Sequence, residues 1–136
     1  SEMFTDIDGV GDITALTFLL TIEEPGRFRS SRQVGAYLGL KPRRDQSGEL
    51  DKELPITKAG DNRLRRLLVQ AAHRILGPFG KDSDLRRWGL RLVERGGRGA
   101  KGKAVAAVAR KLAVLMHRLW VTGEVYEPLR VASQVA

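Results

Sequence analysis

The chain has 136 residues, the usual size of one compact domain. It contains no cysteine, which excludes disulfides, thiolate catalysis and cysteine-ligated zinc, and no apolar run approaches the ~18 residues of a membrane span. There are 24 Lys+Arg against 16 Asp+Glu, a formal net charge of +8, although residues 1–26 hold six acids and no base. The basic excess predicts a polyanionic partner, and a basic surface kept only for solubility is the alternative.

The location expected for the chain is the cytoplasm. The N-terminus is acidic and lacks the basic-then-apolar order of a secretory signal. The absence of cysteine also favours a reducing compartment. No membrane partner is predicted.

The first predicted elements are two short helices. The first covers 12–22 and is ended by Pro25 and Gly26; its apolar face is predicted to comprise Ile13, Leu16 and Leu20 with the neighbouring Phe18 and Leu19. The second begins after a cap supplied by Ser30 or Ser31 and runs to about Leu38, where Gly39 closes it.

A glycine-bearing turn at 7–11 precedes the first helix and resembles a helix-hairpin-helix turn. Gly9 and Gly11 could hold a phosphate, because a helix N-terminus offers free backbone amides and a positive dipole end. Most such turns only begin a helix, and Asp8 within this one would repel a phosphate.

Residues 40–60 form an insert without helical period, predicted as an irregular loop or short β-hairpin. Ser47 in this insert could be a nucleophile, with Arg43 and Arg44 holding a phosphate; a serine that fills an exposed turn is the alternative. Four nearby acids could ligate magnesium, but a solvated charged loop explains them better, and no metal site is predicted.

Three further helices complete a mainly α architecture. One runs from Asp61 to the Gly77–Pro78 break, and the next is capped by Asp82 or Ser83 and turns Leu85 and Trp88 inward. A basic, glycine-rich linker at 96–103 leads to the longest helix.

Basic side chains lie along these helices, and contact with a phosphate backbone is predicted for some of them. A solvated helix face is the alternative for each one alone. Neither His73 nor His117 has the partners of a zinc site or an acid–base role. The predicted nucleic-acid-binding residues are Arg43, Arg44, Lys58, Arg63, Arg66, Arg98, Lys101, Lys103, Arg110 and Lys111.

Five motifs in fixed order resemble the C-terminal domain of insertion-sequence 110/116/902 transposases, to which the Piv-type DNA invertases are similar. These are Ile7-Asp8-Gly9-Val10-Gly11-Asp12-Ile13, Phe28-Arg29-Ser30-Ser31-Arg32-Gln33, Tyr37-Leu38-Gly39-Leu40-Lys41-Pro42-Arg43, Gln46-Ser47-Gly48 and Ile56-Thr57-Lys58-Ala59-Gly60. The family usually has proline where this chain has Asp8.

The resemblance implies a serine-dependent recombinase that cuts and rejoins DNA. The family's serine nucleophile falls on Ser47. An N-terminal RuvC-like domain, absent here, would bind Mg²⁺, so no cofactor is expected in this chain and the isolated domain is not expected to cleave DNA. Some members use a bridge RNA as guide, and the full-length protein is expected to form homo-oligomers. Residues 1–6 are then expression-derived or linker residues, 7–124 the serine-bearing domain and 125–136 a tail.

Two other functions stay open at this point. The domain could be a non-catalytic basic module that docks DNA or RNA, with Ser47 only a turn residue. It could also be a self-association domain, because the last helix carries apolar residues over a wide arc.

Overall fold

The computed structural model describes residues 2–40 and 58–130, which form helices and connecting turns. The helices are α1 (Glu2–Thr5), α2 (Asp12–Ile22), the 3₁₀ turn η1 (Pro25–Arg27), α3 (Arg32–Tyr37), α5 (Lys58–Leu76), α6 (Asp84–Glu94) and α7 (Ala100–Thr122). The prediction of a mainly α fold is confirmed, with no strand in these two ranges. The insert predicted at 40–60 falls almost entirely on residues 41–57, outside the described part of the chain.

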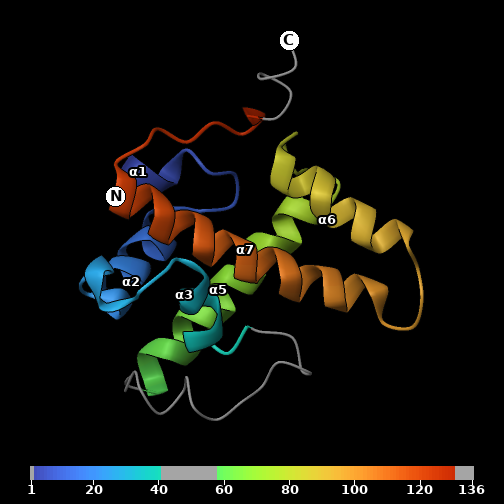
Figure 1. The fold of residues 1–136 in the computed structure, drawn as a ribbon. Helices are drawn as coiled ribbons and strands as arrows, with labels where there is room; N and C mark the ends of the chain where they lie inside the picture. The colour runs from blue at the N-terminus through green and yellow to red at the C-terminus, as the bar shows by residue number, and fades with distance from the viewer. Residues whose placement is uncertain (1, 41–57, 131–136) are drawn as a thin grey trace.

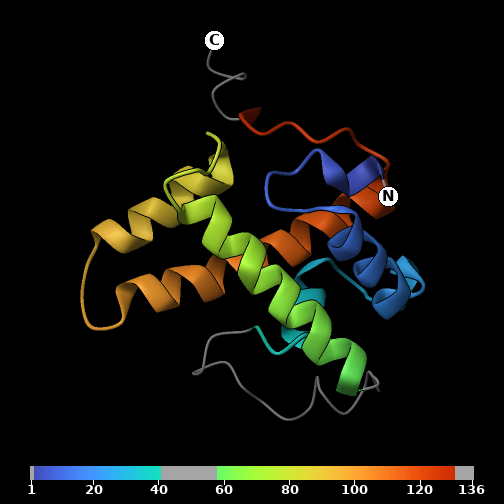
Figure 2. The same ribbon diagram turned by 180° about the vertical axis from the view of Figure 1, so that it is seen from behind.

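Helix α7 runs through the middle of the molecule and organises the others around it (Figure 1). It packs against α5, α6 and α3, and α2 packs on α5. Seen from both sides, α5 crosses α7, α6 lies along the first half of α7, and α1, α2 and α3 gather at its other end (Figures 1 and 2). No described helix is long and apolar enough to cross a membrane.

Helix α5 contributes the apolar face that the sequence predicts. Leu64, Leu68, Ala72 and Ile75 are buried in the core, as the i, i+4, i+8, i+11 spacing requires. The helix begins at Lys58, three residues earlier than predicted.

The predicted linker at 96–103 is wrong over its second half. Gly99 takes a left-handed conformation and precedes the first residue of α7, Ala100. Gly99 ends the connecting turn, and the helix begins directly after it. Lys101 and Lys103 therefore lie in the first turn of α7 and not in a linker.

The bounds predicted for α2 are confirmed, but only Phe18 and Leu19 of its predicted apolar face pack into or against the core. Ala15, Phe18 and Ile22 face the core, whereas Ile13 and Leu20 are exposed. The helix is apolar around most of its circumference, so the spacing of its apolar residues does not predict which side is buried. Phe18 decides the choice: its ring packs between those of Phe4, at 5.4 Å, and Trp120, at 6.2 Å.

Residues near both ends of the chain contribute to the packing. Phe4 is fully buried, although 1–6 were expected to be linker. Tyr126, in the expected tail, is half-buried against the core, and the carbonyl of Pro128 accepts a hydrogen bond from the Asp84 amide at 2.7 Å.

Candidate nucleic-acid interface

Helix α6 is fixed at its first turn by two side chains. The Ser83 hydroxyl caps the helix by accepting a hydrogen bond from the Arg86 amide at 3.0 Å. Of the two predicted caps, Asp82 and Ser83, the structure therefore uses Ser83. The Arg86 guanidinium donates to the carbonyls of Ile75, at 2.6 Å, and Gly77, at 2.7 Å. The Arg86 side chain thereby satisfies two carbonyls at the end of α5.

Gly89 lets α6 approach α7 closely. It is buried, and a Cβ on it would come within 2.6 Å of side-chain carbons of Leu76 and Val108. The close approach brings outer residues of α6 next to those of α7, which builds the surface described next.

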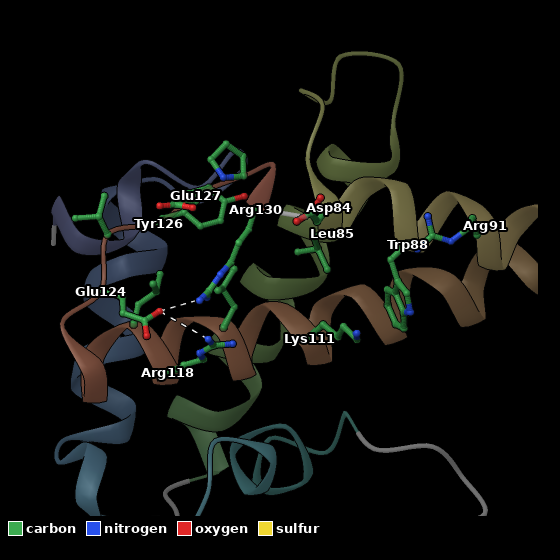
Figure 3. Close-up of a pocket in the computed structure, with 14 residues that line it drawn as sticks. Asp84, Leu85, Trp88, Arg91, Lys111, Arg118, Glu124, Tyr126, Glu127 and Arg130 are labelled. Carbon is green, nitrogen blue, oxygen red and sulfur yellow. Dashed lines mark ion pairs between the residues drawn. The ribbon is translucent and has the colours of Figure 1, made fainter. Parts of the chain in front are cut away.

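A pocket of about 750 Å³ lies between α6, α7 and the segment after α7 (Figure 3). Its apolar lining includes Trp88, Leu115 and Tyr126, and its polar lining includes Arg91 and Lys111. Burial raises the pKa of Tyr126, and Asp84 adds to this shift. The lining therefore combines aromatic and cationic side chains with three acids, Asp84, Glu124 and Glu127.

At the α6 end of the pocket, the Lys111 ammonium lies 4.2 Å from the centre of the Trp88 ring. Partial burial lowers the pKa of Lys111, and the positive charges of Arg110 and Arg91 lower it further. Within the described residues, neither Lys111, Arg91 nor Arg110 forms an ion pair with an acid. Arg110 and Arg91 thus place two further positive charges near Lys111, and this positive field favours a bound anion.

Other arginines near this surface have acidic partners. Glu124 lies between Arg118, at 3.7 Å, and Arg130, at 3.5 Å, at the opposite end of the pocket (Figure 3). Arg87 pairs with Asp82 at 2.7 Å, and this contact raises the pKa of Arg87 and lowers that of Asp82. Their charge is partly neutralised within the protein, which sets the cluster of Arg91, Arg110 and Lys111 apart.

The predicted binding residues form two separate groups. Arg63 and Arg66 are exposed on α5, and Lys58 is the first residue of that helix. Arg98 is exposed in the α6–α7 connection, close in sequence to the exposed Lys101 and Lys103. The start of α5 and the α6–α7 connection lie at different edges of the molecule (Figures 1 and 2). Arg43, Arg44 and Ser47 lie outside the described residues.

The stem of Arg110 packs inward against α3. A Cβ on Gly35 of α3 would lie 2.6 Å from Cγ of Arg110, so the aliphatic part of this arginine covers the glycine. Arg110 is consequently half-buried, and its charge adds to that of Lys111 next to it.

The glycine turn before α2 has a packing role. Gly9 has φ +90°, and a Cβ there would lie 3.1 Å from the backbone oxygen of Ala71. Asp8 accepts from Arg74 at 3.3 Å and from the Lys81 amide at 2.8 Å, which ties the turn to the end of α5. Gly11 precedes α2 with open space around its α-carbon. Phosphate contact by Gly9 and Gly11 stays a prediction.

Ser31 occupies the N-cap position of α3, as predicted, but its hydroxyl makes no capping hydrogen bond and lies instead 2.8 Å from Nδ1 of the buried His117. This contact and the bond from His117 to the Pro25 carbonyl satisfy both ring nitrogens. Within the described ranges, no three His, Asp or Glu side chains are grouped closely enough to hold a metal ion.

Trp88 and Arg91 line the pocket but are not among the binding residues predicted from the sequence. Trp88 was expected in the core, yet it is only half-buried and carries Lys111 on its ring. The signal available was a Trp and an Arg three residues apart on α6, which places them on one helix face. Their meeting with Lys111, twenty or more residues away, depends on how α6 packs on α7.

Comparison with known proteins finds a transposase family and individual transposases. The profile of the family "Transposase IS116/IS110/IS902 family" matches residues 1–83. The chain is 35% identical over 121 residues to the transposase for insertion sequence element IS1111A of Coxiella burnetii, covering 88% of this chain and 32% of that protein. It is 32% identical over 139 residues to the putative transposase y4pF/y4sB of Sinorhizobium fredii, covering 100% of this chain and 35% of that protein.

A DNA-inverting protein is also similar. The pilin gene-inverting protein of Moraxella lacunata is 27% identical over 118 residues, which are 86% of this chain and 35% of that protein. The chain spans about a third of the length of these three relatives. No solved structure matches.

Proposed function

Since this chain belongs to the IS116/IS110/IS902 transposase family, we propose that it is the DNA-binding, serine-bearing part of a transposase that cuts and rejoins DNA. The observation that carries the binding part of this proposal is the cationic cluster of Arg91, Arg110 and Lys111. These side chains have no acidic partner within the described residues, and a phosphate would supply one.

A nucleic-acid strand fits this surface for two physical reasons. Phosphates that bind unpaired cations release counterions, which favours association. A phosphate near Lys111 also offsets the repulsion from Arg110 and Arg91 that lowers the pKa of this lysine. The Trp88 ring under Lys111 gives the strand an apolar surface beside the charges.

The chemical step is assigned to Ser47. Its hydroxyl oxygen attacks a DNA phosphorus, and a serine–phosphate ester forms as the bond to the leaving deoxyribose oxygen breaks. The leaving oxygen gains a proton and the serine loses one, so the step is balanced. Attack by a hydroxyl of another strand reverses it, rejoins DNA and frees Ser47. Arg43 and Arg44 would hold the phosphate and stabilise the charge on its oxygens.

Mg²⁺ is expected to act in the full-length protein, where it would stabilise charge on the phosphate. The described residues of this chain do not group ligands for it, so no step here is assigned to the metal. We propose that the chain alone binds DNA without cleaving it, because a serine hydroxyl without a base or metal to activate it is a poor nucleophile.

Binding is tested with a fluorescent DNA duplex, measured by anisotropy over a range of salt concentrations. The double variant Arg91→Gln/Lys111→Gln should bind more weakly and lose about 0.9 from the log–log salt slope for each phosphate contact removed. Arg87→Gln is the matched control, because the partner of Arg87 is Asp82 and its loss should leave the slope unchanged. An unchanged slope in the double variant would reject this surface.

A structured RNA presents the same phosphates and is tested as a competitor. If a bridge RNA shares the surface, unlabelled RNA displaces the duplex from the chain and the double variant weakens both ligands together. If RNA binds elsewhere, the double variant weakens DNA alone.

The serine step is tested by strand exchange in a full-length transposase that carries this sequence. Ser47→Ala should abolish exchange while DNA binding survives. Ser30→Ala is the control, because Ser30 is exposed. Exchange that persists in Ser47→Ala would leave the domain as a nucleic-acid docking module.

A further inference from the structure

Helix α2 turns a stripe of large apolar side chains to the outside. Ile13, Leu16 and Leu20 are 63%, 55% and 67% exposed, and their spacing of three and four residues places them on one face. The fourth exposed residue of this helix is Asp12. An apolar helix face of this kind, outside the core, is typical of a surface that a partner covers.

Acidic side chains lie at both ends of α2. Asp12 lies at the first turn of α2, and Glu23 and Glu24 follow its last turn; all three are exposed. The first base in the chain, Arg27, directs its guanidinium inward to the Ile22 carbonyl at 2.9 Å and the Tyr37 hydroxyl at 3.2 Å. These three acids would repel a phosphate, so the two ends of α2 differ in charge from the cationic cluster on α6 and α7.

We propose that the α2 face is a docking surface for a protein helix with an apolar stripe flanked by lysine or arginine. The apolar side chains would pack on Ile13, Leu16 and Leu20. The flanking cations would meet the acids at the two ends of α2. This charge complementarity selects the partner and its orientation. The proposal is independent of the nucleic-acid function.

A second copy of the chain fits this face poorly. If two α2 helices packed antiparallel, Asp12 of each would lie opposite Glu23 and Glu24 of the other. If they packed parallel, equal charges would face each other along the helix. Both arrangements bring like charges together at the rim, which opposes association.

The test uses a fluorescent helical peptide with a leucine stripe and lysine flanks, titrated with the chain and followed by anisotropy. We expect binding that weakens with salt and falls at least about tenfold in the triple variant Ile13→Ser/Leu16→Ser/Leu20→Ser, since each buried side chain contributes to affinity. Val121→Ser is the matched control, because Val121 is 58% exposed on α7 and outside the stripe. The triple variant should fold normally, as shown by an unchanged unfolding temperature.

Three results would overturn the proposal. The first is no binding of the lysine-flanked peptide. The second is equal binding by the chain and its triple variant. The third is concentration-dependent dimerisation in sedimentation equilibrium that the triple variant abolishes, which would assign the stripe to a second copy. A peptide with glutamate flanks serves as a charge control. If it binds, it binds the basic surface, so its affinity should be the same for the chain and for the triple variant.

Discussion

The hydroxyl oxygen of Ser31 lies 2.8 Å from Nδ1 of His117, a residue 86 positions later in the chain. The other ring nitrogen, Nε2, lies 2.7 Å from the carbonyl oxygen of Pro25. Because a carbonyl only accepts, Nε2 carries the proton, and Nδ1 accepts the proton of the Ser31 hydroxyl. His117 is 2% exposed, so these contacts join α7 to η1 and to the start of α3 inside the protein.

Replacing Ser31 by alanine should destabilise the fold. Nδ1 of the buried His117 would lose its donor, and a buried polar group without a partner costs about 1–3 kcal/mol. Urea unfolding measures this loss. Ser30→Ala, at an exposed neighbour, should change the free energy of unfolding by less than about 0.5 kcal/mol. Equal stability of the two variants would contradict a structural role for the Ser31–His117 bond.

This result bears on how the serine nucleophile is identified. A Ser31→Ala variant could lose strand exchange because the fold is weakened, without any part for Ser31 in the chemistry. Ser30 is therefore the better comparison for Ser47.

The sequence predicts α5 well because its apolar residues occupy one side only. Leu64, Leu68 and Ile75 recur at helical spacing, with arginines, Gln70 and His73 on the opposite arc, so periodicity identifies both the helix and its buried face. In α2 the same reasoning finds the helix but does not separate its buried residues from its exposed ones, because Leu16 and Phe18 are both apolar. The ring contacts of Phe18 are tertiary and cannot be seen in the spacing.

The sequence predicts that the candidate site is basic, but it does not predict which basic side chains meet there. A run without acids from 96 to 123 identifies a basic surface that includes Lys111. Charge alone does not separate Arg86, whose guanidinium caps α5, from Arg91, which lies at the pocket. Only the packing of α6 on α7 decides which arginine is available to a ligand.

Gly9→Ala should destabilise the protein by about 1–3 kcal/mol. Its φ of +90° is strained for any residue with a Cβ, and the added methyl group would meet the Ala71 backbone. Gly11→Ala is the control: its φ is −94° and its surroundings are open, so a change below about 1 kcal/mol is expected. Thermal and urea unfolding of both variants measure the difference, and a smaller loss at Gly9 than at Gly11 would refute the packing role of the turn.

Arg86→Met should destabilise the junction of α5 and α6 by about 2 kcal/mol or more. The substitution keeps an apolar stem and removes the charged donors to the carbonyls of Ile75 and Gly77. Hydrogen exchange should speed up at the end of α5 first. Arg87→Gln removes only a pair exposed to solvent and should leave unfolding unchanged. Normal stability of Arg86→Met would show that the cap is dispensable.

Lys111 should lose its proton at a lower pH than an ordinary lysine, whose pKa is 10.5, and the shift should depend on Arg91. Burial is the main cause, and Arg110 and Arg91 lower the pKa further, so Arg91→Gln should raise it. A phosphate bound beside Lys111 should raise it too. Between the lowered pKa and 10.5 the unfolded chain binds more protons than the folded one, so this group makes stability rise with pH there.

The measurement is NMR of isotope-labelled lysine side chains as a function of pH. Lys111 is assigned by its disappearance in Lys111→Gln. The control is again Arg87→Gln, because Arg87 is not among the groups that shift the pKa of Lys111. A Lys111 pKa that stays constant in Arg91→Gln, or that falls when the DNA duplex is added, would show that these cations do not act as one phosphate-binding cluster.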